Sequence, residues 1–395
     1  MEEWKEYRLG DVGIITTGKT PKTSVDEYYG GNIPFVTPAD INTPYKYVTE
    51  TVRYLTDKGL TSIASNSIDE GSICVSCIGN LGYAGIVQKR CASNQQINSI
   101  TVRNEFDRDF VYYAIKRLWP LFKNHEGQST TVSILNKGQF SKITIKCPSL
   151  VVQKRISSIL SSLDDKIECN RRINDNLLQQ TQAIYKSWFV DFEPFLDGEF
   201  VESELGMIPK GWEVGKLFDV AEVLDKYRKP LSGQERDLMD KIYPYYGATS
   251  CMDYVDDYLF DGIYTLIGED GSVVKEDGLP YMQYVWGKLW VNNHAHILQG
   301  KNGFSTEMLH VMLSTTNIRH LVTGAVQAKL SQANMQKILV AIPSTNILDE
   351  IRPKFDKLYQ LIRKNEDESH HLSQLRDTLL PRLMSGKLKV NELTM

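Results

Sequence analysis

The stretch that decides the fold is ISSILSSLDDKIECNRRINDNLLQQTQAIYKSW, residues Ile156–Trp188. Positions taken alternately four and three residues apart along it, beginning with Ile156 and Leu160, are mostly apolar. That spacing is typical of a coiled-coil seam, because a repeat of 3.5 residues keeps one narrow stripe facing a partner helix. A second stripe with the same spacing covers Leu348–Leu383. The sequence therefore predicts two long helices that pair with each other.

Polar residues interrupt both stripes at matching points. Asn170 and Asn365 occupy the same place in the two stripes, and a polar residue in a seam fixes the register of a coiled coil at some loss of stability. The alternative is that each helix is amphipathic and packs only on its own domain. The length and narrowness of the stripes favour a pair of helices that holds two small domains apart.

The regions that precede the two helices repeat one another. WKEYRLGDVGII from Trp4 matches WEVGKLFDVAEV from Trp212, and FSKITIKCPS ending at Ser149 matches MQKILVAIPS ending at Ser344. Short β-like runs broken by Gly, Asn and Pro lie between these motifs. The predicted fold is α+β, with two similar domains of mixed short strands and helices, joined by two long helices in an antiparallel coiled coil with a pseudo-twofold repeat. The predicted segments are a first domain at 1–148, a central spacer helix at 149–190, a connecting segment at 191–211, a second domain at 212–343, a C-terminal spacer helix at 344–386 and a tail at 387–395.

The composition describes a globular chain with no strong overall charge. It has 395 residues, 42% hydrophobic, and 45 Lys plus Arg balance 49 Asp plus Glu, so any surface for a polyanion must be local. The N-terminal MEEWKEYRLGD lacks the pattern of a signal peptide, and no apolar run approaches the roughly 20 residues that cross a bilayer. We therefore expect a cytoplasmic protein without membrane contact.

The cysteine and histidine spacings do not predict a metal site. Cys74 and Cys77 form a single CxxC within a strand-like run, where residues three apart face opposite ways. We expect all six cysteines to be free structural thiols. His294 and His296 could share one face of a strand, but with no third ligand nearby a hydrogen-bonding role is favoured.

Four motifs carry a resemblance that covers almost the whole chain. They are GKTPKTSVDEYYGGNIPFVTPADI from Gly18, YKSWFVDFEPF from Tyr185, SELGMIPKGWEVGKL from Ser203 and LLPRLMSGKLKV from Leu379. In their order and spacing the chain resembles the specificity subunits of type I restriction-modification enzymes. One departure is that the second domain has DKYRKP from Asp225 where the first has GKTP, so the two domains are expected to use different residues.

The resemblance implies a recognition protein that carries no catalytic residue and no cofactor of its own. Each domain would be a target-recognition domain that reads one half of a split sequence in double-stranded DNA, and the helices would set the distance between the halves. Two methyltransferase subunits would bring S-adenosylmethionine, and two motor-nuclease subunits, which use ATP and Mg, can join them for cleavage.

Two other functions fit parts of the sequence. The tetrad Asn32-Ile33-Pro34-Phe35 has the form of an adenine N6-methyltransferase motif, in which the Asn holds the target amino group and the aromatic stacks on the base. That reading lacks the glycine-rich cofactor turn that should precede the motif, so the tetrad is more simply a strand. The near-neutral charge also fits a scaffold that binds proteins through two β-rich modules. Steep weakening of DNA binding by salt would separate recognition from scaffolding.

Base recognition needs side chains with paired donors and acceptors on loops that reach a groove. The alternative for each such residue is a solvated loop or a turn-stabilising side chain. The predicted DNA contacts in the first domain are Lys19, Thr20, Lys22, Asp40, Asn42, Asn80, Tyr83, Gln95, Gln96, Gln128 and Ser129. Those in the second are Lys226, Arg228, Lys229, Tyr246, Ser250, Asp270, Ser272, Asn292, Asn293, Gln327 and Lys329.

The helix ends are the predicted docking sites for the methyltransferase subunits. Apolar residues repeat there, and aromatic side chains at the end of a stripe are more suited to packing or to partner contact than to base stacking. The residues concerned are Trp188, Phe189, Leu383 and Met384.

Overall fold

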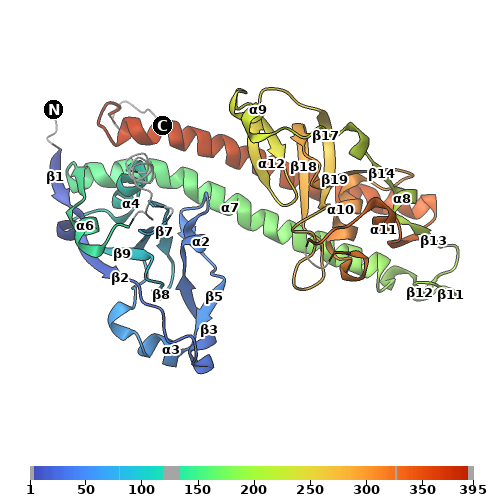
Figure 1. Ribbon diagram of the computed structural model, residues 1–395, viewed down its shortest axis with the longest axis horizontal. Helices are drawn as coiled ribbons and strands as arrows, with labels where there is room; N and C mark the ends of the chain where they lie inside the picture. The colour runs from blue at the N-terminus through green and yellow to red at the C-terminus, as the bar shows by residue number, and fades with distance from the viewer. Residues whose placement is uncertain (1–3, 80, 119–133, 325–326, 390–395) are drawn as a thin grey trace. The chain divides into compact units, whose positions relative to one another are not determined.

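A computed structural model describes residues 4–79, 81–118, 134–324 and 327–389, and Figure 1 labels most of their helices and strands. The chain divides into two compact units. Unit 1 combines residues 1–171 with 366–395, and unit 2 is residues 172–365. Both long helices, α7 (Leu150–Phe189) and α12 (Thr345–Leu383), are shared between the units. The predicted spacer segments therefore do not form a compact unit of their own.

The first domain is built on a sheet with the strand order β2-β9-β6-β7-β4. A second sheet, β5-β3-β8, carries the NIPF tetrad in its middle strand, and β1 pairs with β10. The strands are β1 (Lys5–Arg8), β2 (Gly13–Thr17), β3 (Tyr29–Val36), β4 (Tyr47–Val48), β5 (Arg53–Leu55), β6 (Ile73–Ser76), β7 (Ala84–Val87), β8 (Ala92–Ser93), β9 (Ile97–Val102) and β10 (Thr144–Cys147), and the helices are α1 (Leu9–Val12), α2 (Pro38–Ile41), α3 (Asp57–Thr61), α4 (Arg108–Arg117) and α6 (Lys137–Lys142).

The second domain has a sheet with the order β14-β19-β17-β18-β15-β16, and β13 pairs with β20. A hairpin of β11 and β12 lies in the predicted connecting segment. The strands are β11 (Phe200–Ser203), β12 (Gly206–Pro209), β13 (Glu213–Lys216), β14 (Ala221–Val223), β15 (Tyr243–Tyr246), β16 (Cys251–Val255), β17 (Phe260–Gly268), β18 (Met282–Val291), β19 (Ala295–Gly300) and β20 (Leu339–Ile342), and the helices are α8 (Leu217–Val220), α9 (Gly233–Asp237), α10 (Thr306–Ser314) and α11 (Gln332–Met335).

The two domains repeat in structure as they do in sequence. Lys5 faces Cys147 in the β1–β10 pair, and the residues that match them, Glu213 and Ile342, face each other in the β13–β20 pair. β4 joins β7 in parallel, as β15 joins β18. Helices α4 and α10 begin alike, because a side chain just before each one accepts a hydrogen bond from a free backbone N–H of the first turn. This repetition confirms the predicted α+β class.

The seam predicted for the long helices is buried in both units. In unit 1, Ile156 and Leu160 pack in one core with Leu380 and Leu383. In unit 2, Leu177 packs with residues of α12 such as Ile362. As residue numbers rise along α7 they fall along α12, so the helices run antiparallel in each unit. The cores also include domain residues, so each helix packs on a domain and on the other helix at once.

The polar seam residues pair across the helices in a symmetric way. Asn170 donates to Ser369 Oγ over 3.3 Å in unit 1, and Asn365 donates to Asn174 Oδ1 over 2.8 Å in unit 2. The repeat matches Asn170 with Asn365 and Ser369 with Asn174, so these are the same contact in its two copies. The prediction that Asn170 and Asn365 are equivalent seam residues is confirmed.

Candidate nucleic-acid interface

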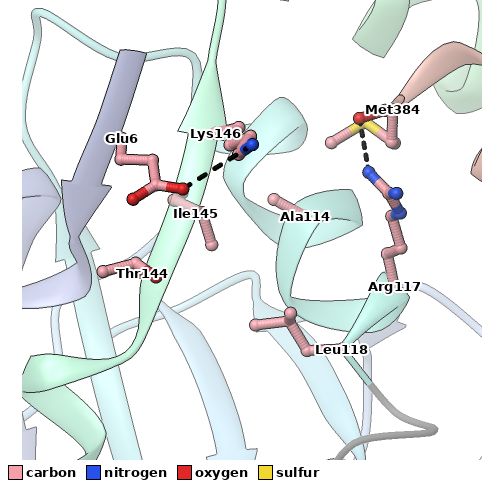
Figure 2. Close-up of a pocket in the computed structure, with 8 residues that line it drawn as sticks. All are labelled: Glu6, Ala114, Arg117, Leu118, Thr144, Ile145, Lys146 and Met384. Atoms are coloured by element: carbon pink, nitrogen blue, oxygen red, sulfur yellow. Dashed lines mark hydrogen bonds and ion pairs between the residues drawn. The ribbon is translucent and has the colours of Figure 1, made fainter. Parts of the chain in front are cut away.

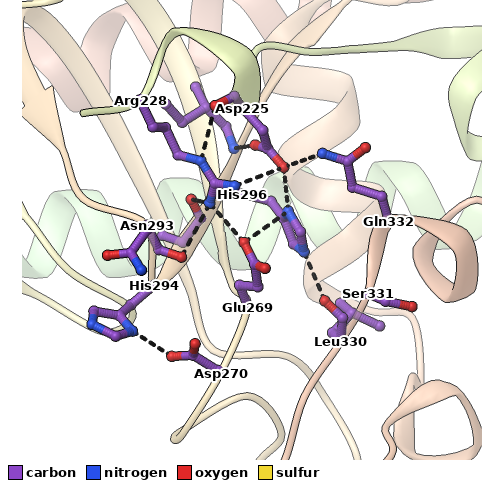
Figure 3. A network of polar contacts seen from close by, with 12 residues as sticks. Asp225, Arg228, Glu269, Asp270, Asn293, His294, His296, Leu330, Ser331 and Gln332 are labelled. Atoms are coloured by element: carbon purple, nitrogen blue, oxygen red, sulfur yellow. Dashed lines mark hydrogen bonds and ion pairs between the residues drawn. The ribbon is translucent and has the colours of Figure 1, made fainter. Parts of the chain in front are cut away.

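Residues from four loops of the second domain lie together around Arg228, and Figure 3 draws some from each loop. Its guanidinium donates to Glu269 Oε2 over 2.7 Å, to the carbonyl of Ala295 over 2.7 Å and to that of Asn293 over 3.3 Å. Lys329 connects the fourth loop to this group, because its ammonium forms an ion pair with the Glu269 carboxylate at 3.3 Å. The loops at 225–230, 269–272, 292–294 and 327–330 thus form one surface, the second loop cluster.

Beneath this cluster His296 and Asp225 form a buried polar pair. The ring of His296 is bonded to Asp225 Oδ2 over 2.5 Å, and its other nitrogen donates to the carbonyl of Leu330 over 2.7 Å. Asp225 also accepts from Gln332 and from the backbone of Ile297. Burial would raise the pKa of the Asp225 carboxyl, but the bonds from His296 and Ile297 and the charge of Arg228 lower it overall. Asp225 is therefore an anion that ties three segments together.

The same pair belongs to a group that resembles a metal site. Ligand atoms of Asp225, Glu269 and His296 lie within 4.8 Å of one another, so the reason given from sequence against a metal, the lack of a third ligand, is wrong. The guanidinium of Arg228 already supplies a cation to both carboxylates, and both nitrogens of His296 are engaged in hydrogen bonds. These contacts favour the predicted hydrogen-bonding role of His296.

The first domain has an equivalent cluster built with neutral groups. Asn98 is the second residue of β9, as His296 is the second residue of β19. Asn98 donates to the carbonyl of Leu135 over 3.1 Å and accepts from Thr17 Oγ1 over 2.6 Å. Leu135 matches Leu330, so the polar residue beneath each cluster grips the same carbonyl. Cys77 donates its backbone N–H to Gln96 as Glu269 does to His294. We call the loop residues 18–25, 77–79, 81–83 and 94–96 the first loop cluster.

Predicted DNA contacts of the first domain fall partly on this cluster. Thr20 donates to Gln95 over 2.8 Å, and Lys19 and Lys22 are exposed beside it. Gln96 is partly buried and accepts from Asn94. Three predicted residues, Asn80, Gln128 and Ser129, lie outside the described residues.

Two other predicted contacts lie on adjoining segments, and a third, Tyr83, lies on the cluster itself. The carboxylate of Asp40 accepts from Thr37, as part of a capping box, and from the backbone of Val52, so it is a turn-stabilising residue. Asn42 is exposed at the end of α2. Tyr83 lines a cleft of about 520 Å³ in unit 1, together with Leu380 and Pro381 of α12.

The second domain brings more of its predicted residues together. Asp270 binds His294 at 2.5 Å, Lys329 pairs with Glu269, and the backbones of Asp270 and Lys329 form a β-bridge. Asn292 is 3% exposed, with its amide bonded to Met252 Sδ and the His294 backbone, so this side chain is out of reach of DNA. Exposed predicted residues are Lys226, Lys229, Ser250, Ser272, Asn293, Gln327 and Lys329, and Tyr246 is partly buried.

Three of the four predicted docking residues at the helix ends require correction. Phe189 is 5% exposed, Leu383 0% and Met384 2%, and all three belong to the cores of their own units. Trp188 is partly buried and packs edge-on against Phe195. Figure 2 shows Met384 with Arg117 of α4, whose guanidinium donates to the Met384 carbonyl over 2.5 Å. Phe189, Leu383 and Met384 therefore pack inside their own units, whereas a partner contact by the partly buried Trp188 stays a prediction.

Sequence reasoning missed the residues that organise the second cluster. Asp225 and Glu269 are not among the predicted contacts, and Arg228 is among them although its side chain is only 12% exposed. The available signal was the repeat itself, since aligning Asn98 with His296 marks a polar position inside an apolar strand in both domains. Buried polar residues of that kind need partners.

The remaining motifs have structural roles. Phe35 of the NIPF tetrad is 1% exposed and packs with Leu55 and Leu60, so it cannot stack on a base. All six thiols are free, but Cys169 and Cys251 are exposed, so the expected structural role fits only the four buried cysteines. Burial raises the pKa of Cys77 to about 11. Cys74 and Cys77 belong to different cores, as their spacing predicts. None of the described helices is both long and apolar enough to span a membrane.

Comparison with known proteins defines the class of this molecule. The family model for the type I restriction modification DNA specificity domain matches residues 1–179 and 209–374, so the chain belongs to that family. Members are the DNA-specificity components of restriction-modification enzymes, which makes this chain a recognition subunit that reads a DNA target and performs no chemistry itself.

Individual relatives agree with the family. The chain is 28% identical to the type I restriction enzyme MjaIX specificity subunit of Methanocaldococcus jannaschii, over 99% of this chain and 95% of that one. It is 35% identical to a putative type I specificity subunit of Haemophilus influenzae, S.HindORF215P, over 37% of each chain. The crystal structure of the S subunit from M. genitalium has the same fold, with a TM-score of 0.53 and 17% identity over 97% of this chain and 96% of that one.

Proposed function

We propose that this subunit reads a bipartite DNA sequence, one half-site by each loop cluster. The observation that carries the proposal is that both domains gather predicted contact residues on equivalent loops at equivalent strand ends. Loops held at the end of a rigid sheet can enter a groove without distorting the domain beneath them. The different residues on the two clusters suit two different half-sequences.

Each cluster offers the two kinds of contact that DNA recognition needs. Exposed lysines, Lys19 and Lys22 in one domain and Lys226 and Lys229 in the other, suit phosphates and set the register on the duplex. Amide side chains such as Gln95 and Asn293 can pair with base edges in the major groove. The net charge of -4 does not oppose this function, since binding depends on the local field.

The partners follow from the family and complete the enzyme. We assign two methyltransferase subunits that carry S-adenosylmethionine, and two motor-nuclease subunits that carry ATP and Mg and join for cleavage. The chain itself needs no cofactor for recognition. Its DNA substrate and these partners suit a cytoplasmic complex.

The long helices serve in this proposal as the spacer between half-sites. Support comes from α7 and α12, each of which continues without a break from one compact unit into the other. A coiled coil is stiff along its axis, so the number of residues in the pair would fix the number of base pairs between the half-sites.

The test is to purify the subunit with its methyltransferase partners and map methylated adenines in host DNA. We expect one split sequence with a fixed gap. Replacing residues 1–148 with the corresponding domain of a relative should change one half of that sequence and leave the other half unchanged. A replacement of the second domain, residues 212–343, is the matched control and should change only the other half. A swap that scrambles both halves, or a complex that methylates without any split sequence, would refute the proposal.

A further inference from the structure

The geometry points to Arg228 as a positioning residue for recognition of the second half-site, one that acts by holding the loops and does not touch a base. This inference rests on the function proposed above and specifies how one domain achieves it. Arg228 stands in the loop that replaces the GKTP motif of the first domain, between two exposed lysines, Lys226 and Lys229.

The contacts of Arg228 use most of its hydrogen-bonding capacity inside the protein. Nε donates to the carbonyl of Asp225 over 3.2 Å, and Nη2 lies 3.4 Å from the carboxylate of the same residue. Nη1 serves Glu269 and the carbonyls of Asn293 and Ala295. An arginine reads guanine with two parallel N–H groups, and Arg228 could offer such a pair only by abandoning an ion pair in a site that is 12% exposed.

The same contacts explain what Arg228 positions. Its own loop presents Lys226 and Lys229, and the turn that it grips by two carbonyls presents Asn293. Glu269, held by Arg228, in turn holds the ammonium of Lys329 at 3.3 Å. Three loops that carry predicted DNA contacts are therefore fixed relative to one another through a single planar guanidinium, whose several donors in a rigid fork suit this task better than a lysine would.

The first loop cluster is held in another way. There Gly18 leaves no room for a side chain, since a Cβ would lie 2.0 Å from the carbonyl oxygen of Asn94. The backbone of the loop therefore lies directly on the 93–95 turn, and Thr20 bonds Gln95 across it. The first cluster is held together by close backbone packing and not by a guanidinium. Substitution of Arg228 should therefore leave recognition of the first half-site unchanged.

The experiment compares target sequences methylated by the complex with wild-type subunit, Arg228→Lys and Glu269→Gln. Arg228→Lys keeps a positive charge next to Glu269 but loses the planar set of N–H donors that binds the other loops. We expect discrimination to fall by about tenfold at several positions of the second half-site, with the first half-site unchanged. Glu269→Gln should give the same pattern more weakly. Lys229→Ala is the matched control and should lower affinity without relaxing any position.

Each other outcome overturns the inference. Relaxation at a single base pair would identify Arg228 as a direct base contact, and an unchanged second half-site, even with a lower melting temperature, would reduce it to a stabilising residue. If Arg228→Lys fails to fold, Glu269→Gln decides by the same criteria. Failure of the proposed function is distinguishable, because the wild-type complex would then show no split target at all.

Discussion

The two loop clusters occupy the same place in two copies of one fold, yet the polar groups beneath them differ in charge. Thr17, Asn98 and the Leu135 carbonyl are neutral, whereas His296 donates to the Leu330 carbonyl and is itself bonded to the charged carboxylate of Asp225. The fold requires only a donor for one buried carbonyl at this point. The loop residues that lie over this bond can therefore differ between the two domains. Such differences allow a duplicated domain to recognise a second sequence.

The largest effect should come from lengthening the helices, which separates the two clusters without altering either. Residues 165–171 are duplicated after Arg171, and residues 359–365 after Asn365. Both insertions fall at the boundary between the units, so they keep the Asn170–Ser369 and Asn174–Asn365 contacts and the 3.5-residue seam. Seven residues add roughly 10 Å, or about three base pairs along DNA.

Selection from random DNA should then recover the same two half-sequences with a longer gap, or no sequence at all. The original target should fall to nonspecific affinity, a loss of about a thousandfold or more. The second half-site also turns by about a third of a helical turn, which can prevent binding of the longer site. Three-residue insertions at the same points are the control and should disrupt the seam. Continued preference for the original spacing would show that the helices are not the spacer.

The next effect tests whether the charged cluster depends on its partners more than the neutral one. Asp225→Ala removes the acceptor of His296, Gln332 and the Ile297 backbone N–H and one of the two carboxylates beside Arg228. We expect about 3–5 kcal/mol lower stability of unit 2. Thr17→Val removes one neutral bond beneath the first cluster and should cost unit 1 about 1 kcal/mol. Unfolding in urea is followed by hydrogen exchange of backbone amides. Amides of β17 report the stability of unit 2, and amides of β6 report that of unit 1. Equal losses would mean that the difference in charge has no energetic consequence.

Acid should also act unequally on the two units. His310 in α10 is matched by Tyr112 in α4, and burial lowers the pKa of His310 to about 4. The unfolded chain binds this proton near pH 6.5, whereas the folded chain binds it only near pH 4. Neutral His310 therefore makes its full contribution to the stability of unit 2 above pH 6.5, and this contribution is lost as the pH falls toward 4. Because His310 as a whole residue is only partly buried, we expect unit 2 to lose no more than about 1–2 kcal/mol between pH 7 and 5. His310→Gln should abolish the difference; a pH dependence that persists in this variant would exclude His310 as its source.

The smallest effect distinguishes contacts to phosphates from contacts to bases. Lys19→Ala and Lys226→Ala, one in each cluster, should each reduce the slope of log affinity against log salt by about one and weaken all sequences alike. Lys58→Ala is a surface control, since Lys58 pairs with Glu27 outside the loop cluster. An unchanged slope for Lys19→Ala or Lys226→Ala would remove that lysine from the interface.

The fold was largely predictable from the sequence because its signals are local and repeated. Apolar spacing along Ile156–Trp188 gives a helix directly, and two matched copies of Trp-led and proline-ended motifs gave the domains. The seam residues Asn170 and Asn365 were identified in this way. What could not be predicted was the division of each helix between two compact units, which depends on contacts between residues about 200 positions apart.

The candidate site was less predictable, because a loop sequence does not reveal which side chains turn inward. Arg228 and Lys229 are neighbours with similar chemistry, yet one is enclosed by acceptors and the other is exposed. Asp40 and Asn292 likewise satisfy local backbone groups. Phe189 and Leu383 were placed on a docking surface because apolar helix ends look alike in sequence whether they face a partner or a core.

The division into units also determines the order in which the chain can fold during translation. Unit 2 is continuous, whereas unit 1 needs both ends of the chain. The α7 residues Ile156 and Leu160 must wait for Leu380 and Leu383, and at about 5–20 residues per second that delay is on the order of tens of seconds. During it an apolar stripe is uncovered and open to chaperones. A ribosome that stopped at Asn365 would therefore release a chain with a complete unit 2 but without the α12 residues that unit 1 needs. Unit 1 would be incomplete although every residue of the first domain had already been made.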